Sequence, residues 1–304
     1  MISIRLALDW TPNINHLGFF VAREKGWYRA RGLRVELLDP AADNYQVTPA
    51  KKVELGQADF ALCPLESIIS YRTKPQPFAL QAVAAILQED LSAIAVRADA
   101  GIESPRDLDG RTYASYGARY EDGIVRQMVR NAGGRGELVI EYPDKLGIWE
   151  TLIQDRCAAT WVFLNWEGVE AQQGQVPLRY FKMRDYAIPY SYSPVIAAAE
   201  GQISNKRDPY RAFLAATWEG YRYAAQEPAA ALELLAPFLP PRDRQIDLQQ
   251  CLTQSLAAFG TYLNWGRMAE GEVAVFLDWI HVQGLEALRL SPAEVMTNEL
   301  LPSS

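Results

Sequence analysis

Residues 8–28 read Leu-Asp-Trp-Thr-Pro-Asn-Ile-Asn-His-Leu-Gly-Phe-Phe-Val-Ala-Arg-Glu-Lys-Gly-Trp-Tyr, and this stretch decides the expected fold. The apolar residues 4–8 predict a short buried strand. Pro12 cannot join a regular strand ladder, so a helix is expected to begin near Ile14 or Asn15. Ligands of open α/β sheets bind beyond the carboxyl ends of the strands. The candidate ligand-binding residues at this turn are therefore Asp9, Trp10, Asn13 and His16.

A purely structural interpretation of this turn stays open. A Trp after a first strand is often a packing residue, and Asn13 suits a helix N-cap. His16 can pack against its own helix, although its place near Trp10 favours the site. Packing and ligand binding are equally compatible with the turn taken alone.

Length and composition limit the class of protein. A chain of 304 residues has room for two lobes, and 49% hydrophobic with 22% charged residues is typical of globular proteins. The net charge of −7 and the lack of a basic run argue against nucleic acid or an anionic membrane as partner. No apolar run reaches the ~18 residues of a membrane span.

Three separated cysteines and two histidines indicate neither a disulfide framework nor a metal site. We therefore expect no cofactor and no metal. The expected partner is a small-molecule ligand, and the expected oligomeric state is a monomer. No export signal is visible at the N-terminus. The expected location is periplasmic or cell-surface if such a signal has been removed, and cytoplasmic otherwise.

Strand and helix signals alternate over the first 200 residues, which predicts an α/β fold with a parallel sheet and right-handed crossovers. Two similar strands of small apolar residues, 92–96 and 193–199, bracket about a hundred residues. We expect residues 1–91 with 193–304, including C-terminal helices, to form lobe 1, and residues 92–192 to form lobe 2. Hinges are expected near 89–92 and 189–193.

Further candidate ligand-binding residues follow other predicted strands. The helix after Pro64 directs free backbone N–H groups toward the crevice, and the turn at 116–120 suits an anionic group. Aromatic faces and carboxylates suit a planar aminopyrimidine or a similar heterocycle. These candidates are Glu66, Ser67, Tyr116, Gly117, Arg119, Tyr120, Trp166, Glu167, Tyr190 and Tyr192.

Structural alternatives apply to several of these candidates. Glu66 can be an ordinary first-turn acid of its helix, and Trp166 with Glu167 can equally be a helix start or a ligand contact. Tyr190 and Tyr192 belong to the expected hinge.

Several phrases resemble one known family. They are Leu8-Asp9-Trp10-Thr11-Pro12 through His16, Ala22-Arg23-Glu24-Lys25-Gly26-Trp27-Tyr28, Gly56-Gln57-Ala58-Asp59-Phe60, Asp107-Leu108-Asp109-Gly110-Arg111 and Ala158-Ala159-Thr160-Trp161. The chain resembles the NMT1/THI5-like proteins, which join solute-binding proteins of ABC transporters, including the ThiY type for thiamine-pyrimidine precursors, with fungal thiamine-pyrimidine synthases. The resemblance implies a type II periplasmic-binding-protein fold, two α/β lobes with a ligand cleft between them, and an ABC permease as partner.

The resemblance also helps to separate a binder from an enzyme. The synthases carry a pyridoxal phosphate Lys after the Gly-x-x-Asp strand, a His four residues later, and a Cys-rich iron-binding run. Cys63 and Ser67 stand at the first two positions, and residues 190–194 contain no cysteine. A Schiff base needs an amine, so the resemblance favours a solute-binding protein and not an enzyme. The alternatives are a pyridoxal-phosphate/iron-dependent synthase-like enzyme and a cytoplasmic ligand-binding sensor.

Overall fold

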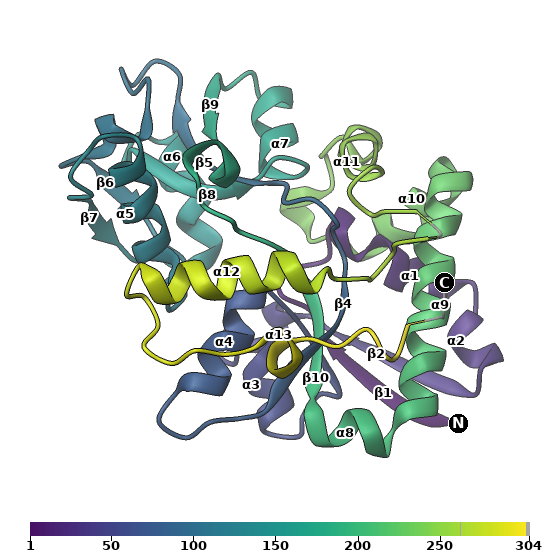
Figure 1. The fold of residues 1–304 in the computed structure, drawn as a ribbon. Coiled ribbons are helices and arrows are strands. Elements are labelled where there is room, and N and C mark those ends of the chain that lie inside the picture. The colour runs from purple at the N-terminus through teal and green to yellow at the C-terminus, as the bar shows by residue number, and fades with distance from the viewer. Residues whose placement is uncertain (262, 302–304) are drawn as a thin grey trace. The chain divides into compact units, whose positions relative to one another are not determined.

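The computed structural model describes residues 1–261 and 263–301, which form two compact units (Figure 1). Unit 1 comprises Met1–Asp90, Ser191–Ala274 and the described part of Leu290–Ser304. Unit 2 comprises Leu91–Tyr190 and Val275–Arg289. The chain therefore passes between the units after Asp90, Tyr190, Ala274 and Arg289, and not only at the two expected hinges.

The expected division assigned residues 193–304 entirely to the first lobe, whereas the structure gives 275–289 to unit 2. Helix α12 (Glu270–Val282) runs across this division. The rings of Tyr190 and Phe276 lie 5.7 Å apart, and Arg119 donates to Glu286. These contacts join the late segment, residues 275–289, to unit 2. The periodicity of strands and helices in the sequence does not predict such contacts between distant residues.

Unit 1 is built on a five-stranded sheet of order β2-β1-β3-β10-β4. Its strands are β1 (Ile2–Ala7), β2 (Leu33–Leu38), β3 (Phe60–Cys63), β4 (Leu80–Ala85) and β10 (Val195–Ala199). β1 pairs in parallel with β2 and β3, as predicted. The sheet, predicted as parallel, is mixed, because β10 lies antiparallel between β3 and β4.

Helices cover both faces of this sheet; α1, α2 and α9 lie on one side and α3 and α4 on the other in Figure 1. The helices of unit 1 are α1 (Leu17–Glu24), α2 (Trp27–Ala30), α3 (Pro49–Glu54), α4 (Leu65–Thr73), α8 (Glu200–Asn205), α9 (Arg207–Gln226), α10 (Pro228–Leu235), α11 (Leu248–Ser255) and α13 (Pro292–Val295). Short 3-10 turns lie at Ile14–His16, Pro40–Asp43, Ala236–Phe238 and Pro241–Asp243. The core joins the sheet to α9, since Phe60 and Phe213 stack with centroids 4.7 Å apart.

Unit 2 has a five-stranded sheet of order β7-β6-β8-β5-β9. Its strands are β5 (Ser92–Arg97), β6 (Thr112–Ala114), β7 (Val139–Glu141), β8 (Ala159–Phe163) and β9 (Leu178–Phe181). Its helices are α5 (Glu121–Asn131), α6 (Ile148–Ile153) and α7 (Glu167–Gln173), with 3-10 turns at Pro105–Leu108, Lys145–Gly147 and Met183–Tyr186. β6 is parallel to β7 and β8, whereas β5 is antiparallel to β8 and β9. This sheet is therefore also mixed.

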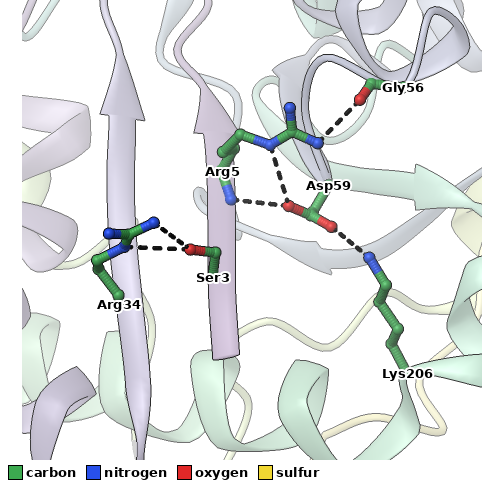
Figure 2. A network of polar contacts seen from close by, with 6 residues as sticks. All are labelled: Ser3, Arg5, Arg34, Gly56, Asp59 and Lys206. Atoms are coloured by element: carbon green, nitrogen blue, oxygen red, sulfur yellow. Dashed lines mark hydrogen bonds and ion pairs between the residues drawn. The ribbon is translucent and has the colours of Figure 1, made fainter. Parts of the chain in front are cut away.

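The buried carboxylate of Asp59 joins β1, β3 and the start of α9 (Figure 2). One oxygen accepts from the Arg5 backbone N–H at 2.9 Å, and the other accepts from the Lys206 ammonium at 2.7 Å. The Arg5 guanidinium also donates to the Gly56 carbonyl at 2.8 Å. Asp59 precedes β3, so this network lies at the amino end of the strand. The Asp of the Gly-x-x-Asp motif thus aligns two strands and lies away from the strands' carboxyl ends.

Candidate functional site

A fully buried histidine holds an aspartate at the carboxyl end of β1. His16 Nε2 lies 2.7 Å from Asp9 Oδ1, and its Nδ1 accepts from the Asn13 backbone N–H at 3.3 Å. Because Nδ1 accepts a hydrogen bond, the ring proton belongs on Nε2, which then donates to Asp9. The Asp9 side chain remains 26% exposed. His16 therefore fixes the orientation of the Asp9 carboxylate, which is partly exposed to solvent.

Asn13 shapes this turn through its own backbone neighbours. Its Oδ1 accepts from the Asn15 backbone N–H at 2.9 Å, and its Nδ2 donates to the Thr11 carbonyl at 3.1 Å. Tyr221 donates to the Asn15 carbonyl at 2.5 Å and ties the turn to α9. The helix begins at Ile14, as predicted. Asn13 therefore has the capping role that the sequence left open as one of its two interpretations.

The indole of Trp10 is half-buried and packs against a ring that sequence reasoning missed. Trp10 and Tyr45 have centroids 5.0 Å apart at an interplanar angle of 53°. Asn44 and Tyr45 both have positive φ, at 52° and 59°, so the backbone turns sharply there. Burial raises the pKa of Tyr45 to about 12. Neither periodicity nor a motif marks Tyr45, because it lies in an irregular loop.

The end of β3 adds acidic and thiol groups to the same region of unit 1. Glu66, in the first turn of α4, is 5% exposed, and Ser67 is half-buried. Burial, followed by the negative charges of Asp9 and Glu66, raises the pKa of the Cys63 thiol. The ends of β1 and β3 lie close together, because the two strands pair in parallel with Ala7 opposite Ala61. Cys63 stays a protonated thiol, which is neither a nucleophile nor an amine.

The backbone donors of the turn between β6 and α5, which was expected to suit an anionic group, are occupied by side chains of the chain itself. Glu121 Oε1 accepts from the Tyr116 backbone N–H at 3.0 Å, and its Oε2 accepts from the Ala118 N–H at 3.2 Å. The Gly117 N–H donates to Ser115 Oγ at 3.0 Å. The carboxyl group of Glu121, the first residue of α5, therefore binds backbone donors of the turn that precedes it. Residue types alone do not predict this contact.

Burial is the main influence on the Glu121 carboxyl group. Glu121 is 3% exposed, and this burial raises its pKa, while hydrogen bonds from the Tyr116 N–H and the Tyr113 hydroxyl act in the opposite direction. The Tyr113 hydroxyl donates to Oε1 at 2.8 Å. Gly117 has φ +73°, a conformation that favours glycine. The Glu121 carboxyl group thus accepts hydrogen bonds from the backbone of the turn and from Tyr113.

Arg119 and Tyr120 converge on a buried glutamate of the late segment. Arg119 Nη2 donates to Glu286 Oε2 at 2.9 Å, and the Tyr120 hydroxyl donates to the same oxygen at 2.6 Å. Glu286 and Tyr120 are 4% and 2% exposed. These two candidates therefore help to hold the segment 275–289 on unit 2.

The remaining candidates lie at the end of β8 and near the unit boundary. Trp166 is 5% exposed, and Glu167 accepts from the Phe163 backbone N–H at 2.9 Å. Tyr190 packs on Trp161 at 5.1 Å between ring centroids. Tyr192, in unit 1, is 6% exposed, and its hydroxyl accepts from the Ala269 N–H at 2.9 Å. Each of these contacts is compatible with a structural role.

The structure thus brings some of the candidates together within each unit. In unit 1 we group as one cluster the residues after β1, which are Asp9, Trp10, Asn13 and His16, and those at the start of α4 after the paired strand β3, which are Glu66 and Ser67. In unit 2 the turn after β6 carries Tyr116, Gly117, Arg119 and Tyr120. Among residues 1–261 and 263–301, no three His, Cys, Asp or Glu side chains converge as metal ligands, and no helix has the length and apolarity to cross a membrane.

The fold is that of the periplasmic binding proteins. It superposes on the alkanesulfonate-binding protein SsuA from Xanthomonas axonopodis pv. citri bound to MOPS with a TM-score of 0.71, covering 98% of each chain at 11% identity. The sequence model of the family described as NMT1/THI5 like matches residues 13–231. The chain belongs to the NMT1/THI5-like family.

Two relatives carry names from the two branches of this family. The formylaminopyrimidine-binding protein of Halalkalibacterium halodurans is 27% identical over 236 residues, covering 77% of this chain and 69% of the relative. The 4-amino-5-hydroxymethyl-2-methylpyrimidine phosphate synthase of Legionella pneumophila is 24% identical over 263 residues, covering 86% and 81%. The chain is thus similar to both a binding protein and a synthase.

Proposed function

We propose that this chain is a solute-binding protein that captures a small heterocyclic ligand, of the aminopyrimidine type found in thiamine precursors, for import by an ABC transporter. The observation that carries the proposal is the Asp9 carboxylate, held by buried His16 beside the partly exposed indole of Trp10. The name of the Halalkalibacterium relative supports the same ligand class. The location consistent with this role is the periplasm or the cell surface.

The chemistry of this cluster matches an aminopyrimidine. The exocyclic amine is a hydrogen-bond donor, and a carboxylate such as Asp9 accepts from it. The flat ring can stack on Trp10, and aromatic stacking contributes about 0.5–1.5 kcal/mol beyond burial of area. Because His16 holds Asp9 in place, binding costs little side-chain entropy at that contact.

The contents of the cluster support capture in preference to catalysis. A pyridoxal phosphate imine needs an amine, and Cys63 offers only a thiol whose pKa is raised by burial. The name of the Legionella relative keeps a synthase-like activity as the alternative. Incubation with pyridoxal phosphate separates the two, because a synthase-like site would produce the absorbance of an imine and a solute-binding site would not.

A thermal-shift assay with 4-amino-5-hydroxymethyl-2-methylpyrimidine tests the proposal. At a ligand concentration a hundredfold above the dissociation constant, the melting temperature of this 304-residue chain should rise by about 4 °C. Trp10→Ala should abolish the rise. Trp27→Ala, which removes a half-buried indole packed on Tyr223, is the matched control and should retain it. No rise with any aminopyrimidine would contradict the assigned ligand class.

A further inference from the structure

Two side-chain N–H groups of unit 1 are buried without an acceptor. Among residues 1–261 and 263–301, neither Trp265 Nε1 nor Gln88 Nε2 has a hydrogen-bond partner. The Trp265 side chain belongs to a residue that is only 5% exposed. Buried donors are almost always paired, so an unpaired donor calls for an explanation, of which a bound molecule is one. Both groups can only donate, and their partner must therefore be an acceptor.

Both groups lie at the carboxyl edge of the sheet of unit 1. β10 is antiparallel to β3 and to β4, and β1 is parallel to β3, so β1, β3 and β4 run in the same direction. Gln88 follows the end of β4, as Asp9 follows the end of β1. The Ala85 N–H, at the end of β4, donates to the Gly266 carbonyl at 2.8 Å, which places Trp265 at this edge as well. Ligands of α/β sheets bind at that edge.

The two donors are anchored to the same stretch of chain. The Gln88 N–H donates to the Ala258 carbonyl at 2.6 Å. An added Cβ on Gly260 would lie 2.9 Å from Gln88 Cγ, and Gly260 has φ +82°, a conformation that favours glycine. The Trp265 N–H donates to the Thr261 carbonyl at 3.0 Å. The backbone therefore holds Trp265 and Gln88 in the same part of unit 1.

Tyr221 of α9 connects Trp265 to the turn that carries Asp9. The ring centroids of Tyr221 and Trp265 lie 5.8 Å apart, and the Tyr221 hydroxyl donates to the Asn15 carbonyl. Asn15 precedes His16, which holds Asp9. All of these residues belong to unit 1. The acceptor Asp9 and the donor Trp265 therefore lie at one edge of one unit, connected by Tyr221.

We propose that Trp265 and Gln88 are ligand-binding residues that donate to an acceptor atom of the ligand, which for an aminopyrimidine is a ring nitrogen. The assignment rests on the proposed function, in which Asp9 accepts from the amine of the same ligand. The site then requires a ligand that has both a donor and an acceptor. An analogue without ring nitrogens leaves the buried donors unpaired, and it is a poor ligand for that reason.

Isothermal titration calorimetry tests this requirement with two compounds. They are 4-amino-5-hydroxymethyl-2-methylpyrimidine and its carbocyclic analogue 2-amino-4-methylbenzyl alcohol, which keeps the amine and lacks the ring nitrogens. The wild type should prefer the pyrimidine by at least about tenfold. Trp265→Phe, which removes the N–H and keeps an aromatic ring, should lose most of this preference. Trp218→Phe, at the indole that stacks on Trp265 at 5.6 Å between centroids, is the matched control and should keep it.

Two results of the calorimetry overturn the inference and leave the proposed function intact. One is equal affinity of the wild type for both compounds, and the other is an unchanged preference in a folded Trp265→Phe. If Trp265→Phe does not fold, Gln88→Met takes its place, since it removes the second donor, and the same two results decide.

The indole N–H resonance of Trp265 reports the contact directly. In protein with isotope-labelled indole nitrogens, this resonance should move downfield as the aminopyrimidine binds, whereas that of Trp27, which packs on Tyr223, should not move. Unsubstituted pyrimidine at millimolar concentration is a second probe, because it has ring nitrogens and no amine for Asp9. If the aminopyrimidine does not bind, the proposed function fails and the second probe decides the inference. A shift of the Trp265 resonance with pyrimidine supports it, and an unmoved resonance overturns it.

Discussion

His16 Nε2 lies 2.7 Å from Asp9 Oδ1. This contact joins Asp9, two residues after the end of β1, to the 3-10 turn Ile14–His16 that precedes α1. His16 is fully buried while the Asp9 side chain is 26% exposed. The histidine is therefore a positioning residue, and the aspartate is the group that a ligand can reach.

Replacing His16 by Ala should weaken ligand binding and destabilise unit 1. The variant loses the Asp9 contact and leaves the Asn13 N–H without its acceptor, so we expect a loss of about 2–4 kcal/mol in unfolding free energy. Urea denaturation and calorimetric titration measure the two effects. His281→Ala, in unit 2, is the control and should bind ligand as the wild type does. Unchanged affinity in a folded His16→Ala would show that Asp9 needs no positioning.

Asp59 should matter for stability and not for ligand affinity. Its side chain is 5% exposed and accepts from Arg5 and Lys206 (Figure 2). Asp59 precedes β3, whereas Glu66 follows that strand. Asp59→Ala should cost about 2–4 kcal/mol, because it leaves two cations without their buried partner. Calorimetry on the folded variant should give the wild-type dissociation constant, and a tenfold loss would assign Asp59 to the site. Glu24→Ala, at an exposed pair, should cost about 0.5 kcal/mol or less.

Gly220 in α9 should tolerate no side chain, because a Cβ there would overlap the backbone carbonyl of Gly18 in α1. Gly220→Ala should therefore destabilise the chain by about 3 kcal/mol or more, since neither backbone can move without loss of packing. Gly201→Ala in α8 is the matched control. Its Cβ would meet nothing within 4 Å, and it should stabilise by about 0.5–1 kcal/mol. Thermal unfolding of both variants measures the contrast, and equal melting temperatures would contradict it.

The contribution of Asp109 to stability should disappear in acid. The backbone N–H groups of Arg135 and Glu137 donate to its carboxylate and hold its pKa below the ordinary value of 3.8. A lowered folded-state pKa gives stability that is present above the ordinary value and lost as pH falls through the folded value. Asp109→Asn should therefore destabilise at neutral pH and approach the wild type in acid, once the pH has fallen well below 3.8. Urea denaturation at both pH values measures this.

The control for Asp109 is Asp144→Asn, at an exposed aspartate whose side chain makes no capping hydrogen bond. It should have the unfolding free energy of the wild type at neutral pH. A constant difference between Asp109→Asn and the wild type at every pH would show that charge on Asp109 is unimportant.

The sequence predicts a helix or strand boundary well where the residues at that boundary cause it directly. Pro12 and Asn13 set the start of the helical segment at Ile14, as predicted, and Thr48 with Pro49 opens α3 in the same way. In both places a side chain or a fixed φ angle acts on its nearest neighbours in sequence. The α/β class follows from such signals.

The remaining features depend on contacts between distant residues. The antiparallel direction of β10 is set by where the chain returns to unit 1, and an apolar run has no direction. Tyr45 reaches Trp10 through an irregular loop, and Glu121 turns back onto its own turn. Residue type and spacing alone cannot distinguish a turn that binds an anion from one that already holds a carboxylate.

The central claim is that the chain binds an aminopyrimidine and releases it unaltered. Calorimetric titration with 4-amino-5-hydroxymethyl-2-methylpyrimidine, followed by mass spectrometry of the released compound, tests this most directly. We predict one binding site per chain, a dissociation constant of about 1 μM or lower, and recovery of the compound with its mass unchanged. Absence of binding heat, or recovery of a chemically altered compound, would contradict the account.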